Sequence, residues 1–134
     1  MEIAREDAPA LWAGTMVNIG LAHAELGVRV QAFEAKEHLR LAINAYRSAL
    51  EVYTREQLPQ DWAMTQNNLG NALKNQGIRT GGAQGTELLA QAVDAYRSAL
   101  EVYTREVFPS YYELVRKNLD KAATLLAQAK PDVQ

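Results

Sequence analysis

The chain of 134 residues repeats itself at a spacing of 50 residues, and this repeat constrains the fold more than any other feature. Twelve consecutive residues beginning at Ala45 recur unchanged beginning at Ala95. Between residues 9–58 and 59–108, 24 of 50 positions are identical, and residues 109–130 start a third copy. A fixed period of this length is typical of stacked repeats, in which each unit buries its apolar face against the next unit.

The second half of each full copy predicts a long helix. In copy two, apolar residues recur every three or four positions and so share one helical face. We expect this helix to run from about residue 86 to residue 107, with Thr86 as its N-cap and Pro109 limiting its end. On the opposite face, Glu101 and Arg105 are spaced for a helical ion pair. The apolar face consists of Leu89, Ala92, Val93, Tyr96, Leu100 and Tyr103.

The first half of each copy predicts a shorter helix. In copy two we expect it over about residues 61–76, with Asp61 as a cap and Gly77 as a stop. The residues Ile78–Gly85 then read as a flexible glycine loop. The apolar sides of the three first helices consist of Trp12, Ile19, Ala22 and Leu26; Trp62, Leu69, Ala72 and Leu73; and Tyr112, Leu119, Ala122 and Leu126.

These segments predict an all-α fold with about five helices, each antiparallel to its neighbours. The whole chain, residues 1–134, forms one domain in this interpretation, with a partial repeat or capping helix over about 109–130. Strands are not expected, because no segment alternates apolar and polar residues over a useful length.

Composition argues against several classes of protein. The formal net charge is −2, so nucleic-acid binding, which needs a basic stripe, is not expected. There is no cysteine, which excludes disulfides and thiolate metal sites. No run of 18 apolar residues is present, so no membrane span is predicted. We expect a soluble, cytoplasmic protein.

The sequence also offers no set of residues for catalysis, metal binding or cofactor binding. His23 and His38 lie on different predicted helices without cysteine partners, which favours filler roles over a metal site. The glycine run at Gly81–Gly85 lacks the Gly-Lys-Ser/Thr ending of a phosphate-binding loop and follows no strand. We therefore predict no catalytic residues, no metal, no cofactor and no enzymatic activity.

The spacing shared by the copies resembles the tetratricopeptide repeat (TPR) signature. Copy two carries Leu69-Gly70 on the first helix and Ala92, Tyr96 and Ala99 on the second. Copy one matches these with Ile19-Gly20, Ala42, Tyr46 and Ala49. The chain is similar to expanded-repeat relatives of the kinesin light chain type and to bacterial TPR arrays. The resemblance implies a superhelical solenoid of antiparallel helix pairs. The repeat departs from the family in being 50 residues long, and Asp120 replaces the expected glycine in copy three.

The same resemblance implies that the first helices line a concave groove that binds a peptide. Asparagine amides both donate and accept hydrogen bonds, so they suit an extended backbone of any sequence. The basic residues of copy three favour a ligand with an acidic end, and the apolar residues of copy one favour an apolar end. Lys74 lies on the same face of its helix. The predicted binding residues are Asn18, Met64, Asn67, Asn68, Asn71, Asn75, Lys117, Asn118 and Lys121.

Two alternatives stay open. The matched asparagines Asn18, Asn68 and Asn118 could instead hold neighbouring helices at a fixed spacing. The leading function is a module that binds a protein or peptide partner. The alternative is a scaffold that forms homo-oligomers through its terminal helices, because the partial third copy leaves Leu114, Val115 and Leu125 without a following helix.

Overall fold

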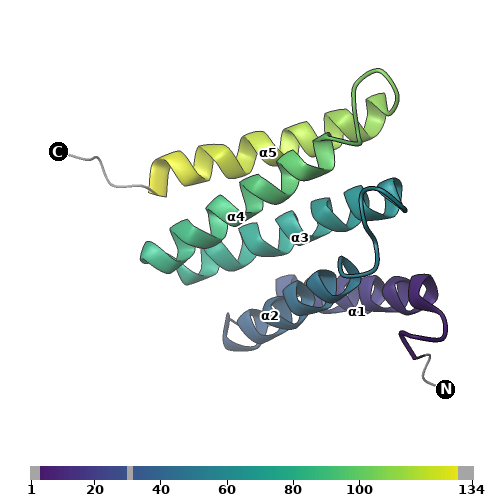
Figure 1. Cartoon of the computed structure of the whole chain (residues 1–134). Helices are drawn as coiled ribbons and strands as arrows, with labels where there is room; N and C mark the ends of the chain where they lie inside the picture. Colours follow the sequence, from purple (N-terminus) through teal and green to yellow (C-terminus); the bar gives the residue numbers. More distant parts are fainter. Residues whose placement is uncertain (1–3, 30–31, 130–134) are drawn as a thin grey trace.

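The structure is a computed structural model that describes residues 4–29 and 32–129, and Figure 1 shows its five α-helices. No strand occurs among the described residues, so the all-α prediction is confirmed. Each helix packs chiefly against the next helix in the chain, while the superhelical path stays a prediction. The helices are α1 Pro9–Arg29, α2 Ala32–Ala49, α3 Pro59–Thr80, α4 Gly82–Leu100 and α5 Pro109–Ala129.

A recurring turn precedes each first helix. In all three copies the amide four residues into the turn donates to the carbonyl at its start: Ala8 to Ala4, Leu58 to Thr54 and Phe108 to Thr104. A proline then opens the helix, where the N–H that it lacks has no helical partner. The structure therefore already repeats with the 50-residue spacing at residue 4, in the turn that precedes α1.

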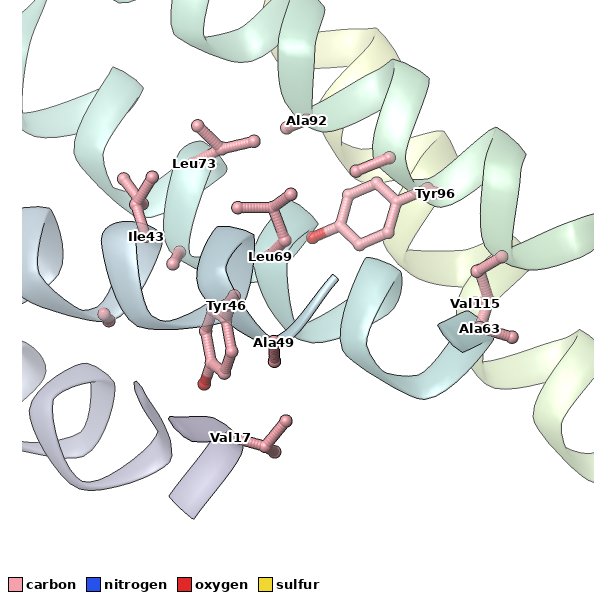
Figure 2. Close-up of a cluster of buried hydrophobic side chains, with 14 of the residues drawn as sticks. Val17, Ile43, Tyr46, Ala49, Ala63, Leu69, Leu73, Ala92, Tyr96 and Val115 are labelled. Carbon is pink, nitrogen blue, oxygen red and sulfur yellow. The ribbon is translucent and has the colours of Figure 1, made fainter. Parts of the chain in front are cut away.

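The core is built from tyrosines packed on glycines. An added Cβ at Gly70 would lie 2.6 Å from Tyr96 Cε1, and one at Gly20 would lie 2.5 Å from Tyr46 Cε1. Both rings are almost completely buried within one apolar cluster (Figure 2). Only a residue without a side chain lets the two helices of a pair approach this closely. Asp120 takes this position on α5, so a tyrosine-bearing helix cannot dock there in the same way.

The predicted boundary between α3 and α4 is wrong. Gly77 does not end α3, which continues to Thr80, and the expected loop at Ile78–Gly85 is helical except at Gly81. Gly77 and Gly85 lie where the two helices touch, since an added Cβ at Gly77 would lie 2.9 Å from the Gly85 carbonyl oxygen. Their role is close approach. Gly81, with φ of +67°, makes the turn.

Neither predicted N-cap acts as one. Helix α3 begins at Pro59, ahead of Asp61, and no side chain caps it. Helix α4 begins at Gly82, and the Thr86 hydroxyl donates to the Gly82 carbonyl at 3.0 Å inside the helix. Helix α4 therefore begins about four residues earlier than predicted, directly after the turn at Gly81.

The predicted helical ion pair between Glu101 and Arg105 is also wrong, because α4 ends before both residues. Arg55 Nη1 instead lies 2.6 Å from Glu101 Oε1, and Arg5 Nη1 lies 2.5 Å from Glu51 Oε1. The two pairs are related by the 50-residue register. Both are exposed, so each contributes at most about 1 kcal/mol.

The apolar side of α1 is not buried as predicted. Ile19 is 39% exposed and Leu26 is 42% exposed, whereas Leu69 and Leu119 on the later helices are each 7% exposed. The difference follows from position: α3 packs against α2 and α5 packs against α4, but no described helix precedes α1.

The opposite end of the chain is better covered than expected. Val115 is fully buried, Leu125 is half-buried and Leu114 is 50% exposed. The expectation that Val115 lacks a covering helix is wrong, because α4 itself covers this side of α5. No helix in the described ranges combines the length and the apolar character needed to cross a membrane.

Candidate partner-binding surface

All nine predicted binding residues lie on the first helices of the copies. The backbones of α1 and α5 both approach α3, whereas those of α2 and α4 stay apart. The first helices α1, α3 and α5 therefore lie closer to one another than the second helices α2 and α4 do. The outward sides of these first helices face the same side of the molecule. One hydrogen bond joins two of the predicted residues, and it links α3 with α5. Asn18 makes no such bond with another predicted residue in the described part of the chain.

Asn67 is not available to a partner, contrary to the prediction. It is 8% exposed, and its Oδ1 accepts a hydrogen bond of 3.1 Å from Asn118 Nδ2 on α5. This hydrogen bond joins the two side-chain amides where α3 meets α5. A buried amide without a hydrogen-bond partner would lower the stability of the fold. This bond supports the structural alternative for Asn118.

The asparagine ladder is therefore uneven. Asn118 is bound to α3, Asn68 is half-buried and Asn18 is exposed. The side chain of Asn67 on α3 accepts the hydrogen bond from Asn118. The equivalent residue on α1 is Val17, whose apolar side chain cannot accept such a bond from Asn68. One substitution between copies thus changes the role of a matched residue.

Asn71 has one structural bond and remains partly accessible. Its Oδ1 accepts a hydrogen bond of 2.5 Å from the Tyr96 hydroxyl, which fixes the amide orientation and directs its NH₂ group away from the tyrosine. Asn75 is half-buried, and its amide has no partner among the described residues. These two side chains and Asn68 are the asparagines of α3 that could still meet a ligand.

Lys74 on α3 and Lys121 on α5 carry like charges that are near enough to affect each other. Lys74 is half-buried, and burial lowers the pKa of its ammonium group; the nearby charge of Lys121 on α5 lowers that pKa further. No carboxylate pairs with either lysine among the residues that the structure describes. Lys117 is exposed on α5 and is likewise unpaired there. The predicted set does not include Lys74, although its place three residues after Asn71 puts it on the adjoining side of the helix.

The surface has an apolar end as well. Met64 on α3 and Leu114 on α5 occupy matching positions of the register and are 40% and 50% exposed. They lie about ten and seven residues before Lys74 and Lys121, or roughly 10–15 Å along the helices. The outward side of α3 and α5, which we name the α3–α5 surface, therefore changes from apolar to basic along its length. It comprises Met64, Asn68, Asn71, Lys74, Asn75, Leu114 and Lys121.

A second polar contact was not anticipated from the sequence. His23 on α1 and His38 on α2 face each other with their Nδ1 atoms 2.9 Å apart and their ring centroids 5.1 Å apart. Such a contact requires one ring to donate and the other to accept. No third histidine, cysteine or carboxylate joins the pair, since no described group of three such residues could hold a metal ion.

Comparison of the chain with protein-family models, with curated proteins and with solved structures found no match.

Proposed function

We propose that the chain is a protein-interaction module that binds an extended, acidic segment of another protein on the α3–α5 surface. The observation that carries the proposal is the approach of Lys74 and Lys121 without a carboxylate in the described residues. Two neighbouring ammonium groups repel each other, and an anionic ligand would relieve that repulsion.

The neighbouring groups suit a peptide backbone. Asn68 and Asn75 offer amides with no described partner, and Asn71 offers its free N–H groups. An amide can both donate to a carbonyl and accept from an N–H group, which would hold an extended segment independently of its side chains. Met64 and Leu114 would receive an apolar residue at the other end of that segment.

The resemblance of the repeat to TPR proteins supports the same class of function. It places ligand binding on first helices, which are the helices that carry this surface. We infer binding without catalysis, and a cytoplasmic setting belongs to the same proposal.

Selection from a random peptide library displayed on phage tests the proposal and does not require the partner to be identified. Wild-type protein should enrich peptides rich in aspartate and glutamate, and their affinity should fall with rising salt. Lys74→Glu/Lys121→Glu should bind the selected peptides at least tenfold more weakly. Lys36→Glu/Arg97→Glu, which changes the net charge by the same amount at exposed residues on α2 and α4, is the matched control and should leave the affinity unchanged.

Two results would count against the proposal. One is an enriched pool without acidic residues. The other is equal loss of affinity in Lys36→Glu/Arg97→Glu, which would show an effect of net charge alone.

A further inference from the structure

Two facing histidines join α1 to α2. The Nδ1 atoms of His23 and His38 are 2.9 Å apart, and the ring centroids are 5.1 Å apart with the ring planes inclined by 25°. The nitrogens are much closer together than the centroids, so each ring directs its Nδ1 atom toward the other ring. Neither ring makes another hydrogen bond within residues 4–29 and 32–129. The contact is therefore a single N–H···N hydrogen bond.

The repeat shows that the fold does not require histidine at these two positions. The equivalent residues in copy two are Leu73 and Leu88. Leu73 is 2% exposed in the apolar core, and Leu88 packs against the same core. Copy one instead has two titratable rings in a half-buried place between α1 and α2. At this place the two helix pairs therefore differ in their ability to bind protons.

The number of protons on the two rings decides whether the contact can form. When both imidazoles are neutral, one Nδ1 donates its hydrogen to the lone pair of the other. When one ring is an imidazolium ion, its Nδ1–H group still donates to the neutral ring, and the hydrogen bond becomes charge-assisted. When both rings are imidazolium ions, both Nδ1 atoms carry hydrogen and two positive charges face each other. The contact therefore tolerates one added proton but not two.

The charged residues beside the pair on α1 and α2 do not remove this conflict. Those within one helical turn of either histidine are all exposed: Glu25 on α1, and Glu34, Lys36, Glu37 and Arg40 on α2. Glu37 is hydrogen-bonded to Arg40, which is the main reason that the pKa of the Glu37 carboxyl is lowered, and the charge of His38 lowers that pKa less. None of the described carboxylates is hydrogen-bonded to either imidazole ring.

Helix α3, which packs against α2, adds positive charge at the same level. Its residue Gln76 donates to the Lys36 carbonyl, two residues before His38. The charged residues of α3 within one turn of Gln76 are Lys74 and Arg79, and both are cations. Two imidazolium ions at the pair would therefore repel each other without an anion bonded to either of them.

We propose that the His23–His38 contact is a pH-sensitive switch that holds α1 against α2 and opens in mild acid. The contact is intact while at most one of the two rings is an imidazolium ion, and it breaks when both are. Histidine side chains ordinarily change charge between about pH 5 and pH 8, so mild acid is the condition that opens the switch. Copy two stays closed, because Leu73 and Leu88 bind no protons. The proposal does not depend on peptide binding by the α3–α5 surface.

The direction of the effect follows from the number of protons that each state binds. In acid, each histidine of the unfolded chain binds an added proton, whereas the folded chain with an intact contact accepts only one for the pair. The unfolded state then binds more protons, so stability falls as the pH falls. Where the difference is one proton, the unfolding equilibrium constant rises by up to about tenfold for each pH unit.

Urea unfolding at pH 7.5 and pH 5 tests the switch against a matched control. His23→Leu/His38→Leu gives copy one the residues that copy two already has at these positions. From pH 7.5 to pH 5, the unfolding equilibrium constant of the wild type should rise at least about tenfold more than that of this variant, because all other titratable groups are shared. A difference below about threefold overturns the proposal.

A second variant separates the conflict between two protons from other effects of acid on histidine. In His38→Asn, the amide oxygen supplies an acceptor that binds no proton in this pH range, so a protonated His23 can still donate to it. The acid sensitivity of His38→Asn should therefore match that of His23→Leu/His38→Leu or be smaller. An acid sensitivity equal to that of the wild type overturns the proposal.

Hydrogen exchange of the wild-type protein locates the opening. Amide protection, corrected for the intrinsic exchange rate at each pH, should fall between pH 7.5 and pH 5 at least about tenfold more around His23 on α1 than around Leu73 on α3. The equivalent helix of copy two thus serves as the control within the same molecule. Equal loss of protection around both residues would show a general effect of acid on the fold and would overturn the proposal.

Discussion

Asn118 on α5 and Asn67 on α3 bind each other across 3.1 Å, so two residues expected to hold a partner hold the molecule together instead. Asn67→Ala should destabilise the fold by about 1–3 kcal/mol, because the amide of Asn118 would lose its partner in a largely buried site. Asn18→Ala, at the exposed position that matches Asn118, is the control and should change stability by less than about 0.5 kcal/mol. Urea unfolding followed by circular dichroism measures both.

The Asn67–Asn118 bond can also be separated from simple loss of packing. In a double-mutant cycle, the effects of Asn67→Ala and Asn118→Ala should fall short of additivity by about 0.5–1.5 kcal/mol. Additive effects would mean that the two amides do not interact in solution.

The fit of Tyr96 on Gly70 predicts a strong effect of one methyl group. Alanine normally stabilises a helix relative to glycine by up to about 1 kcal/mol. Gly70→Ala should nevertheless destabilise the protein by about 1–3 kcal/mol, because its Cβ would lie 2.6 Å from Tyr96 Cε1 and the buried ring would have to move. Thermal unfolding should show the loss as a lower midpoint.

The matched control for Gly70 is Asp120 on α5, which occupies the same register position without a tyrosine against it. Asp120→Ala should change stability by no more than about 0.5 kcal/mol. If Gly70→Ala proved as stable as the wild type, the close packing of Tyr96 would be wrong.

The buried tyrosines predict a loss of stability at alkaline pH. Burial raises the pKa of Tyr46 from 10.0 to about 12, and burial also raises the pKa of Tyr96. Both phenols stay protonated in the folded state after they have begun to ionise in the unfolded chain. Their stabilising contribution is therefore intact below pH 10 and is lost as the pH rises from 10 toward 12, by no more than about 1.4 kcal/mol per pH unit for each tyrosine.

Urea unfolding at pH 8, 10 and 11, with tyrosinate absorbance recorded in parallel, checks this prediction. Tyr46→Phe should flatten the alkaline slope, since the ring stays and the ionisable hydroxyl is removed. An equal slope in the wild type and in Tyr46→Phe would contradict the assignment of the effect to Tyr46.

The bond between His23 and His38 predicts coupling between α1 and α2. Replacing either residue with alanine leaves the other ring nitrogen without its partner in a half-buried site. The double-mutant cycle of His23→Ala and His38→Ala should therefore show a coupling of about 0.5–1.5 kcal/mol in urea unfolding. Coupling below about 0.3 kcal/mol would indicate that the contact is not maintained in solution.

Much of the fold follows from the repeat in the sequence alone. The 50-residue register predicted five helices and the residues that fill the second helices, because apolar spacing and recurring prolines are local signals. Helix ends were less predictable. Gly77 and Gly85 have the composition of a stop and a loop, but they lie inside helices because two backbones touch there. That contact is between residues of different helices, so local sequence does not reveal it.

The candidate surface was predictable in part. The sequence predicted that Met64, Asn71 and Lys121 are accessible on the outward side of the first helices, and the structure leaves them exposed or half-buried there. Partner binding at these residues stays a prediction. The sequence did not distinguish Asn67, which is buried, from Asn75, which is partly accessible. Neighbouring asparagines on one helix differ in burial only through the helix that packs beside them.

By itself, then, the sequence determined the number and order of the helices and the spacing of the copies, because these depend on patterns within each segment. The tertiary structure decided which matched residues differ in role: Asn118 binds Asn67, Val115 is covered by α4, and Ile19 is exposed. The physical reason is that equivalent positions have the same local sequence pattern but different neighbours. Burial, hydrogen bonding and charge pairing all depend on those neighbours.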